Sequence, residues 1–456
     1  MSNTKTHILV FPYPAQGHML PLLDLTHQLS LQNTFTITII ITPNNLSILN
    51  PLLSTHPNTI QTLILPFPSH PNIPPGAENI RHVGNTGNYP FINALSNLQT
   101  PIILWFNAHP NPPVALISDF FLGWTQQLAT RLSIPRVVFY SSSAFLVAVI
   151  NFCWSNLLLL QSKEVVEFPE LPGKPSFKYE HLPSIVLRYR ESDLESEFVR
   201  ESFISNAASW GSVISTCKAL DGRYLDYIRR QFGNSGVYAV SPLGSIRGDG
   251  SDVLGWLDQL EEEGSVLYVC FGSQKIMKRE QMEALAFGLE RSGTKFVWVV
   301  KAPSTVEQIA DGYGLVPEGF EERVSGRGIV VRGWAPQMAI LGHRVVGGFL
   351  SHCGWNSVLE AVATGVGILG WPMEADQFVN AKLLVEDKGV AVRVCEGADS
   401  VPNPDELGRV ISEVMSGDSS QKRRAKLMKE EALGVSSNEL NEFVKALKKL
   451  GVKEGA

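Results

Sequence analysis

The chain has 456 residues, of which 44% are hydrophobic and 18% are charged, and its formal net charge is −6. This length is two to three times that of a usual domain, so we expect two domains of about 200 residues each, and the apolar content excludes a disordered chain. The mild acidity and the lack of a basic run argue against nucleic acid and against insertion at an anionic membrane surface.

The N-terminal run HILVFPYP, at residues 7–14, is short and ends in prolines. Such a run is typical of a first β-strand and differs from a signal peptide. The five cysteines are odd in number and include no CxxC pair. We therefore predict a cytoplasmic protein with reduced thiols and no zinc site, in which the sequon at Asn45 is unused.

Further apolar runs in the first half predict strands at 35–43, 114–121 and 137–142. Runs that do not alternate with polar residues are typical of a parallel sheet covered on both faces. The uncharged stretch at 137–162 is long enough to cross a bilayer. Its three serines, Ser141 to Ser143, and the preceding Pro135 instead favour a strand followed by a buried helix.

The second half repeats the same alternation of apolar runs and helical segments. Its runs lie at 265–273, 295–300, 328–334, 345–350, 366–371 and 390–394. Between the halves, residues 241–252 are rich in Gly, Ser and Asp, which predicts a linker. The charged tail at 421–453 has the apolar spacing of a surface helix.

These patterns predict an α/β protein with two facing, doubly wound Rossmann-like domains. The expected parts are an N-terminal domain at 1–240, the linker at 241–252, a C-terminal domain at 253–430 and a final helix at 431–456 that packs back on the body. Ligands of such sheets bind beyond the carboxyl ends of the strands. We therefore expect the functional residues in the turns from strand to helix, in the cleft between the domains.

The first such turn is PAQGH, at residues 14–18. Gly17 allows a tight turn, and His18 lies at or near the helix start. An imidazole there could act as a general base, because its unperturbed pKa of about 6.5 is close to cytosolic pH. Asp119 ends a strand and could orient His18 and stabilise the protonated ring. The residue types alone leave open a structural histidine and an aspartate that only caps the next helix.

The stretch FLSHCGWNSVLE, at residues 349–360, places polar and aromatic groups where a strand gives way to a helix. The groups at this helix start are His352, Gly354, Trp355, Asn356 and Ser357. Free backbone N–H groups and the positive end of the helix dipole favour an anion such as a diphosphate. The competing interpretation is a capping box, because Ser357 and Glu360 have the Ser-x-x-Glu spacing.

Motifs of several other chemistries are absent from the sequence, which contains no GxxxxGK(S/T), HExxH, GxSxG or Asp-x-Asp. These absences disfavour a P-loop hydrolase, a zinc protease, a typical esterase and a metal-dependent sugar transferase, and we expect no metal. An NAD-dependent oxidoreductase would call for GxGxxG after the first strand, which is also missing.

Residues 334–377 begin with WAPQ, contain HCGWNSVLE and end with WPMEADQ. This segment closely resembles the signature box of the plant family 1 UDP-glycosyltransferases, with the motifs at the family's spacing. The resemblance extends over nearly the whole chain, including PAQGH, SDFFLGW at 118–124 and VCFGS at 269–273. PFPSHP at 66–71 is similar to the branch that glucosylates flavonols and small phenolic acids. The family implies the GT-B architecture, with an active site in the cleft between two Rossmann-like domains.

The resemblance implies that the C-terminal domain binds a UDP-sugar and the N-terminal domain binds the acceptor. Trp334 would stack on uracil, and Ala335 would offer its backbone to the uracil edge. Gln337 and Glu360 would bind the ribose hydroxyls. Aromatic stacking combined with a carboxylate for vicinal hydroxyls suits a neutral nucleoside.

The same resemblance implies that the diphosphate is held by Ser273, His352, Gly354, Asn356 and Ser357. These groups would supply the leaving-group stabilisation that a metal provides in other transferases. The sugar hydroxyls would contact Trp355, Asp376 and Gln377. A glutamine at the last position resembles glucose preference, whereas histidine there often accompanies galactose and some rhamnose-using relatives lack the glutamine. Gln377 thus favours UDP-glucose, with UDP-galactose or UDP-rhamnose as alternatives.

By resemblance, His18 would deprotonate the acceptor hydroxyl while Asp119 holds the imidazole, and the oxygen would attack the anomeric carbon opposite the leaving UDP. We therefore expect a monomeric enzyme without a cofactor that transfers glucose from UDP-glucose, with inversion and without metal. The expected acceptor is phenolic, a flavonoid such as a flavonol with a 3- or 7-hydroxyl. A catalytically silent UDP-sugar-binding module is the remote alternative, because a binding module has no use for a base.

Three details of the sequence refine this expectation. The acceptor pocket is expected in aromatic-rich loops at 66–95, 118–125, 141–155 and 180–210. Ser141 lies near a position that in relatives can touch the primary hydroxyl of the sugar, although three consecutive serines leave the register open. Gly367 stands where the family usually has proline, which puts the local rigidity in doubt.

Overall fold

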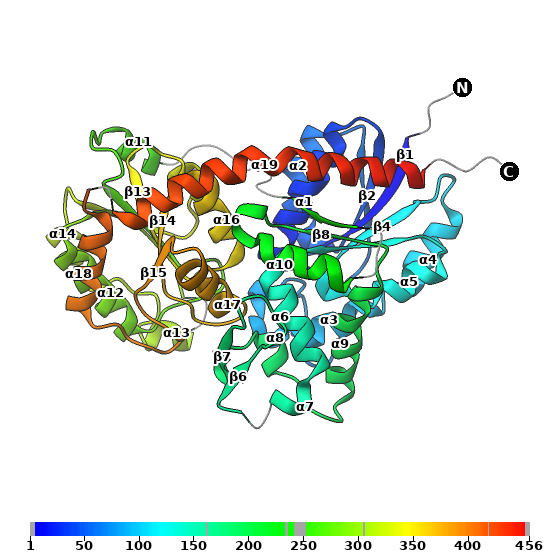
Figure 1. The fold of residues 1–456 in the computed structure, drawn as a ribbon, viewed down its shortest axis with the longest axis horizontal. Coiled ribbons are helices and arrows are strands. Elements are labelled where there is room, and N and C mark those ends of the chain that lie inside the picture. Colours follow the sequence, from blue (N-terminus) through cyan, green and yellow to red (C-terminus); the bar gives the residue numbers. More distant parts are fainter. Residues whose placement is uncertain are drawn as a thin grey trace. The chain divides into compact units, whose positions relative to one another are not determined.

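The computed structural model describes residues 5–160, 163–232, 236–240, 252–303, 306–417 and 419–451 (Figure 1). The chain divides into two compact units. Unit 1 comprises Met1–Ile246 together with Gly434–Ala456, and unit 2 comprises Arg247–Leu433. The predicted linker at 241–252 lies outside the described residues except for its last residue, Asp252.

Unit 1 is built on a seven-stranded parallel sheet with the order β3-β2-β1-β4-β5-β8-β9. The strands are β1 (Thr6–Phe11), β2 (Phe35–Ile41), β3 (Ile60–Ile64), β4 (Ala115–Asp119), β5 (Arg136–Tyr140), β8 (Gly211–Ile214) and β9 (Val237–Ala239). Strands β1 and β4 are neighbours, with Phe11 opposite Ser118. The carboxyl ends of these two strands therefore lie together at one edge of the sheet.

In the part of unit 1 that the structure describes, ten α-helices connect or cover these strands. They are α1 (Gln16–Leu31), α2 (Asn50–Thr55), α3 (Asn88–Ser96), α4 (Gln99–Ala108), α5 (Thr125–Arg131), α6 (Ala144–Ser155), α7 (Leu157–Leu160), α8 (Ser184–Leu187), α9 (Leu194–Ser205) and α10 (Lys218–Gln231). Short 3-10 turns add η1 (Pro43–Leu49), η2 (Ile80–His82), η3 (Asn85–Gly87), η4 (Phe120–Leu122), η5 (Tyr179–His181) and η6 (Asn206–Ala208).

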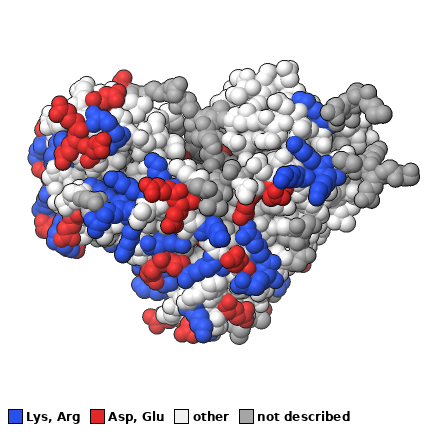
Figure 2. Space-filling view, turned by 45° about the horizontal axis from the view of Figure 1, so that its top comes forward, with Lys and Arg blue, Asp and Glu red and all other residues white. Residues whose placement is uncertain are grey.

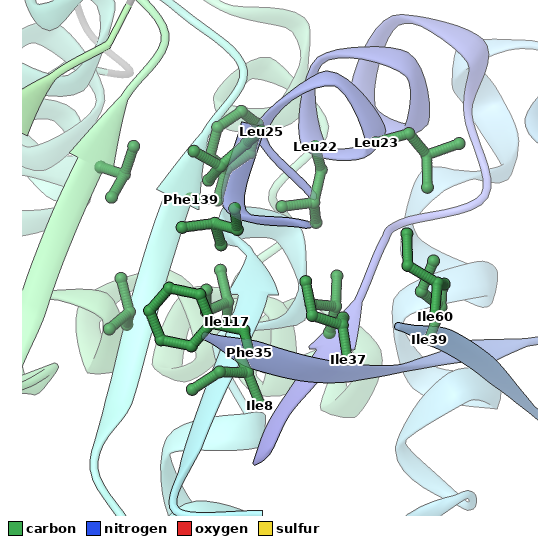
Figure 3. Close-up of a cluster of buried hydrophobic side chains, with 14 of the residues drawn as sticks. Ile8, Leu22, Leu23, Leu25, Phe35, Ile37, Ile39, Ile60, Ile117 and Phe139 are labelled. Atoms are coloured by element: carbon green, nitrogen blue, oxygen red, sulfur yellow. The ribbon is translucent and has the colours of Figure 1, made fainter. Parts of the chain in front are cut away.

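Helix α1 is held on the sheet by its leucines. Leu22 and Leu25 are fully buried and belong to the same apolar cluster as Ile8, Ile37 and Phe139 (Figure 3). Strand residues alternate between the two faces of a sheet, so β-branched side chains at every second position form a continuous surface for the helix. This packing fixes the start of α1 directly after β1.

The uncharged stretch at 137–162 is the strand β5 followed by the buried helix α6, as predicted from its serines and proline. Ser143 caps α6, because its hydroxyl accepts the N–H of Leu146 at 3.0 Å. Among the described residues, no helix combines the length and the apolar character needed to span a membrane.

Unit 2 is built on a six-stranded parallel sheet with the order β12-β11-β10-β13-β14-β15. The strands are β10 (Val266–Cys270), β11 (Lys295–Val300), β12 (Gly328–Arg332), β13 (Val346–Ser351), β14 (Gly367–Gly370) and β15 (Ala391–Arg393). Its helices are α11 (Asp252–Asp258), α12 (Arg279–Ser292), α13 (Val306–Ala310), α14 (Phe320–Arg323), α15 (Gln337–Leu341), α16 (Trp355–Thr364), α17 (Gln377–Lys382), the π-helical η7 (Leu383–Asp387) and α18 (Pro404–Met415). Helices α12 and α18 pack against each other and share one apolar core with the sheet.

The two parallel sheets confirm the predicted α/β class and every strand expected from an apolar run. Five strands were not predicted: β3, β8, β9 and the antiparallel pair β6 (Val165–Glu167) and β7 (Ser176–Lys178). These strands are three to five residues long. Segments this short, some with alternating exposure, carry little apolar signal in the sequence.

Gly367, the departure from the family pattern, is the first residue of β14. A Cβ at this position would meet only ordinary contacts, the nearest being the Lys422 nitrogen at 3.6 Å. Nothing in the surrounding packing therefore requires a glycine.

Charged side chains of both signs lie on the visible face between uncharged areas, and Figure 2 shows Lys and Arg interspersed with Asp and Glu. Several form exposed ion pairs, such as Arg332 with Glu321 at 2.5 Å. Exposed pairs of this kind contribute little to stability, roughly 0–1 kcal/mol each.

The predicted C-terminal helix is α19 (Ser420–Leu450), whose residues up to Leu433 belong to unit 2 and the rest to unit 1. In unit 1, the buried Phe443, Val444 and Leu447 belong to the same apolar cluster as the leucines of α1. Glu439 accepts hydrogen bonds from Arg229 at 2.8 Å and from the N–H of Ala239. This end of α19 is therefore part of the core of unit 1.

We predict that Phe443→Ala lowers the free energy of unfolding by about 3–5 kcal/mol, because the ring is fully buried against Tyr238 and its loss leaves a cavity. The matched control is Lys445→Ala on the same helix, whose side chain is 66% exposed and should change stability by less than about 0.5 kcal/mol. Urea unfolding of both variants checks this. Equal effects of the two substitutions would contradict the role of α19 in the core.

Candidate active site

The candidate residues of unit 1 are His18 and Asp119, which contact each other. Helix α1 begins at Gln16, so His18 lies in its first turn, and Asp119 is the last residue of β4. Nδ1 of His18 lies 3.1 and 3.0 Å from the two carboxylate oxygens of Asp119. Since an ionised carboxylate only accepts hydrogen bonds, Nδ1 carries the proton and Nε2 is left as the basic nitrogen.

Asp119 both contacts His18 and caps a turn, which are the two possibilities that the sequence left open. Its Oδ1 also accepts the N–H of Phe121 at 2.8 Å, so Asp119 caps the turn η4 and contacts His18 at the same time. Its side chain is fully buried, whereas the side chain of His18 is 20% exposed. The aspartate is thus a fixed internal group, and the histidine is the member of the pair that solvent or a ligand can reach.

Aromatic rings surround His18. Phe120 stacks on the imidazole at 5.4 Å between centroids, and Phe121 and Tyr13 meet it edge-on at 4.5 and 5.3 Å. The hydroxyl of Tyr13 donates to Asn88 at 2.7 Å. Burial, and next the charge of Asp119, raise the pKa of Tyr13 well above its usual value, so the phenol stays protonated. His18 is therefore the basic group of this cluster.

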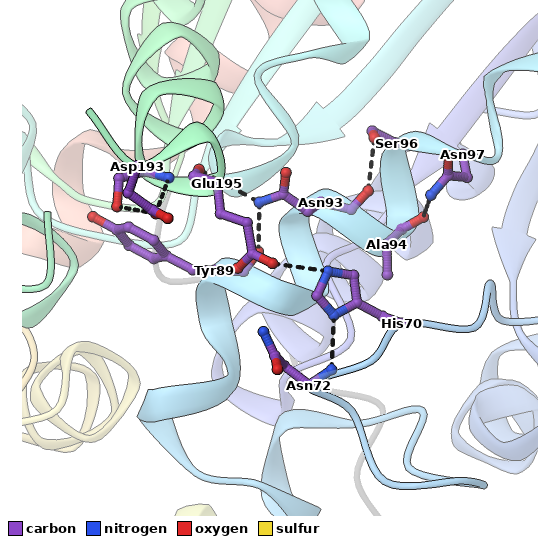
Figure 4. Close-up of polar contacts among 10 residues, drawn as sticks. His70, Asn72, Tyr89, Asn93, Ala94, Ser96, Asn97, Asp193 and Glu195 are labelled. Atoms are coloured by element: carbon purple, nitrogen blue, oxygen red, sulfur yellow. Dashed lines mark hydrogen bonds and ion pairs between the residues drawn. The ribbon is translucent and has the colours of Figure 1, made fainter. Parts of the chain in front are cut away.

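Two of the loops expected to contact an acceptor are joined by polar contacts in unit 1 (Figure 4). Nε2 of His70 lies 3.1 Å from a carboxylate oxygen of Glu195, and Nδ1 of His70 accepts the N–H of Asn72 at 3.2 Å. Asn93 donates to the carbonyl oxygens of Tyr89 at 3.0 Å and of Glu195 at 3.5 Å. These contacts tie the loop at 66–95 to the start of α9.

The candidate residues of unit 2 lie at the carboxyl edge of its own sheet. Each predicted donor-binding residue follows a strand of that sheet. Ser273 follows β10, Trp334, Ala335 and Gln337 follow β12, His352, Gly354, Trp355, Asn356, Ser357 and Glu360 follow β13, and Asp376 and Gln377 follow β14. Because all these strands are parallel, their carboxyl ends share one edge, which is where open α/β sheets bind ligands.

Gln337 joins two of these turns through its side-chain amide, which donates to Ser357 Oγ at 3.0 Å and to Glu360 Oε2 at 2.6 Å. The capping-box interpretation of Ser357 and Glu360 is wrong. Helix α16 begins after Gly354 and has no side-chain cap, so Ser357 already lies within its first turn. Both side chains are engaged by Gln337 on the neighbouring helix α15.

His352 lies between two glycine turns that approach it closely. A Cβ at Gly272, where φ is +78°, would lie 2.7 Å from Nε2 of His352, and a Cβ at Gly354 would lie 2.5 Å away. Burial lowers the pKa of His352 to about 4, so the ring is neutral at cellular pH. Its Nδ1 is buried without a hydrogen-bond partner among the described residues. A neutral imidazole can still donate one N–H to a phosphate oxygen.

The turn that carries Asp376 and Gln377 is held by its own side chains. Oε1 of Gln377 accepts the N–H groups of Met373 at 2.9 Å and Glu374 at 3.1 Å. Asn380, which the sequence analysis did not single out, donates to Asp376 Oδ2 at 2.7 Å and to the carbonyl of Cys353 at 3.0 Å. Its position four residues after Asp376, on the same helical face, is the signal that could have identified it.

The remaining predicted residues differ in exposure. Trp334 is 63% exposed, which leaves an aromatic face for stacking, whereas Ala335 is 8% exposed. Ser273 is exposed. Ser141 is buried, and its hydroxyl has no partner among the described residues. A search of the same residues finds no group of three or more side chains placed to hold a metal ion.

We predict that Gly272→Ala weakens UDP binding by about tenfold, because the new Cβ displaces His352. Gly293→Ala is the matched control: its φ of +68° imposes similar backbone strain, but no atom lies within 4 Å of its Cβ. Calorimetric titration with UDP distinguishes the two. Unchanged affinity in Gly272→Ala would contradict the placement of His352 at the phosphate site.

The chain is similar in sequence to known proteins. The family model described as UDP-glucoronosyl and UDP-glucosyl transferase matches residues 254–428. UDP-glycosyltransferase 89A2 of Arabidopsis thaliana is 54% identical over 425 residues, covering 91% of this chain and 88% of the relative. Flavonol 3-O-glucosyltransferase UGT89B1 of the same plant is 44% identical over 472 residues, covering 99% and 98%.

Solved structures show the same relationship. Arabidopsis thaliana UGT89C1 complexed with UDP-L-rhamnose has a TM-score of 0.81 and 34% identity, covering 97% of this chain and 99% of that one. The same protein complexed with quercetin has a TM-score of 0.80, covering 97% and 100%. The chain therefore belongs to the UDP-glycosyltransferase family and is a glycosyltransferase of the GT-B fold.

Proposed function

We propose that the enzyme transfers glucose from UDP-glucose to a hydroxyl of a flavonol, with inversion and without metal, as a monomer in the cytoplasm. The observation that carries the proposal is the contact of His18 with the buried Asp119. The name of the flavonol 3-O-glucosyltransferase relative and the quercetin complex of UGT89C1 support the acceptor class. All five cysteines are free, which is typical of a reducing compartment.

In this proposal His18 Nε2 takes the proton of the acceptor hydroxyl while Nδ1 keeps its hydrogen bond to Asp119. The buried carboxylate fixes the tautomer and stabilises the imidazolium that forms. The new phenolate oxygen attacks the anomeric carbon, and the bond to the diphosphate breaks on the opposite side. The rings of Phe120 and Phe121 beside the base supply apolar surface that suits a planar phenolic acceptor.

The leaving diphosphate would be stabilised by the N-terminus of α16. The N–H groups at a helix N-terminus and the helix dipole favour an anion, and the neutral His352 adds one donor without its own charge. Developing negative charge on the leaving oxygen is stabilised by donors that are already in place. The side chains of Asn356, Ser357 and Ser273 would complete this set, and Trp334, Ala335, Gln337 and Glu360 would bind the nucleoside.

The donor sugar would contact Trp355, Asp376 and Gln377. With Oε1 held by two backbone N–H groups, the amide nitrogen of Gln377 is the part of the side chain free to act as a donor to a sugar hydroxyl. A rhamnosyl transfer is the second candidate, because the UGT89C1 structure holds UDP-L-rhamnose. Under this proposal the residues at 1–240 bind the acceptor and those at 253–430 bind the donor.

The proposal is tested by a mass-spectrometric assay of the metal-free enzyme with quercetin and kaempferol, each offered UDP-glucose, UDP-galactose and UDP-rhamnose. We expect a hexose-sized mass gain that depends on UDP-glucose. A product from UDP-rhamnose alone would overturn the donor assignment. A requirement for added divalent metal would overturn the proposed leaving-group stabilisation.

We predict that His18→Ala lowers kcat by about 10²–10⁴-fold, the usual contribution of a positioned general base, and leaves the Kd for UDP nearly unchanged. The matched control is His27→Ala on the same helix α1, which should retain wild-type turnover. Steady-state kinetics and UDP titration measure both quantities. Turnover of His18→Ala within twofold of wild type would remove His18 from the mechanism.

We predict that Gln377→His lowers the preference for UDP-glucose over UDP-galactose by about tenfold or more. An imidazole nitrogen cannot accept the N–H groups of both Met373 and Glu374, so the turn at the sugar loosens. Ratios of kcat/KM for the two donors check this, with Gln421→His on α19 as the control. An unchanged ratio would place sugar selectivity elsewhere.

A further inference from the structure

Arg136, the first residue of β5, is a buried cation beside the strand that carries Asp119. Its side chain is 1% exposed, and the register of the sheet places it opposite Leu116 on β4. The guanidinium donates to five oxygen atoms. These are Ser118 Oγ at 2.8 Å, Asn206 Oδ1 at 2.9 Å, Ser209 Oγ at 2.9 Å, the Asp119 carbonyl at 3.3 Å and the Leu122 carbonyl at 3.5 Å.

The guanidinium is hydrogen-bonded to the backbone of the segment that contacts His18. It holds the carbonyl groups at both ends of η4, those of Asp119 and Leu122, and Asn206 donates to the Phe120 carbonyl between them at 2.8 Å. Residues 119–122 carry the carboxylate and the two phenyl rings that contact the imidazole. His18 is therefore positioned by a segment whose backbone carbonyl groups accept hydrogen bonds from Arg136 and from its partner Asn206.

Among the residues that the structure describes, no carboxylate is hydrogen-bonded to Arg136, and its five acceptors are neutral oxygen atoms. A buried cation is unfavourable unless an opposite charge or many hydrogen bonds compensate for it. Burial lowers the pKa of Arg136 to about 10, against the opposing effects of Tyr140 and Asp119, so the guanidinium remains charged at neutral pH. Tyr140 and Asp119 are the two acidic groups whose charge would act on Arg136. Because burial raises the pKa of Tyr140, its phenol stays neutral, and Asp119 is the group whose negative charge compensates the charge of Arg136.

Among the described residues, the ring of Tyr13 contacts His18, the charge of Asp119 acts on Arg136, and Tyr140 interacts with Arg136 and contacts Phe120. Both tyrosines are neutral at cellular pH because burial raises their pKa values. Alternation along the strands places Ser118 and Arg136 on the face of the sheet opposite to Ile117 and Val137, which belong to the core beneath α1. Arg136 thus acts on the pair from the far face of the sheet, through the backbone of Asp119 and through its charge.

We propose that Arg136 is a positioning residue for the transfer reaction, which holds residues 119–122 in place so that Asp119 keeps its contact with His18 while the ring carries the acceptor's proton. The inference rests on the proposed role of His18 as the base. A nearby positive charge favours the carboxylate form of Asp119, so the transferred proton stays on the imidazole. Loss of that charge favours protonation of the pair, and the acid limb of the pH–rate profile then moves to higher pH.

The test compares Arg136→Met and Arg136→Lys in pH profiles of kcat with UDP-glucose and quercetin. Arg136→Met should lower kcat by about 10²-fold, with KM for UDP-glucose within about twofold, and should shift the acid limb upward by about one unit. Arg136→Lys keeps the charge without the planar set of donors, so we expect an intermediate loss and an acid limb near that of wild type. Wild-type kcat and an unshifted limb in both variants would overturn the proposal.

Combination with Asp119→Asn separates positioning through Asp119 from a merely structural role. If Arg136 acts through Asp119, either Arg136 substitution should lower kcat of Asp119→Asn by less than about threefold, because coupled residues are not additive. Full additivity would overturn the proposal, and the arginine-to-lysine variant carries this test if the methionine variant does not fold. Arg327→Met is the matched control, because the guanidinium of Arg327 donates, among the described residues, to the carbonyl groups of Leu289, Glu290 and Thr294 in unit 2.

The outcomes for His18 and for Arg136 are distinguishable. Near-normal turnover of His18→Ala would remove the base, and the proposed function would fail together with this inference. An inactive His18→Ala combined with additive effects of Arg136 and Asp119 would leave the base in place and overturn only the role of Arg136. Arg327→Met should lose stability and keep wild-type kcat and pH profile.

Discussion

The contact between His18 and the fully buried Asp119 is the interaction on which the proposed chemistry depends. A buried carboxylate is unfavourable unless its charge is compensated, so its surroundings must supply hydrogen bonds and positive charge. The N–H of Phe121 and the imidazole supply the hydrogen bonds, and Arg136 supplies the charge from the other face of the sheet. Each of these groups comes from a different element, β4 with η4, α1 and β5, so the sheet order brings them together.

The predicted donor-binding residues of unit 2 depend on a different constraint, which is the close approach of glycine backbone to a side chain. Glycines at 272 and 354 leave room for the ring of His352, and a Cβ at either position would collide with it. Gln337 and Asn380 then connect turns that follow different strands, by way of Ser357 and Glu360 in one case and Asp376 and Cys353 in the other. In unit 2 the predicted donor-binding residues therefore lie on a set of turns that amide side chains join at one edge of a parallel sheet.

Much of this arrangement could be predicted from the sequence because its signals are local. Apolar runs that do not alternate with polar residues identified the central strands of both sheets. PAQGH placed His18 at a helix start, and the run at 114–121 placed Asp119 at a strand end. Arg136 could not be predicted, since nothing local shows that a charged residue opening the run RVVFY has its partners on β4, η4 and η6. The capping-box interpretation was wrong because the Ser-x-x-Glu spacing alone does not show where the helix begins, and α16 already begins after Gly354.

The central claim is a single displacement at the anomeric carbon, driven by a base held on a buried carboxylate. The measurement that tests it most directly is the anomeric configuration of the product formed from UDP-glucose and quercetin, determined by NMR of the isolated glucoside. The account predicts a β-linked glucoside, because one displacement inverts the α-linkage of the donor. An α-linked product would require an even number of displacements or a front-side reaction and would contradict the role assigned to His18 and Asp119.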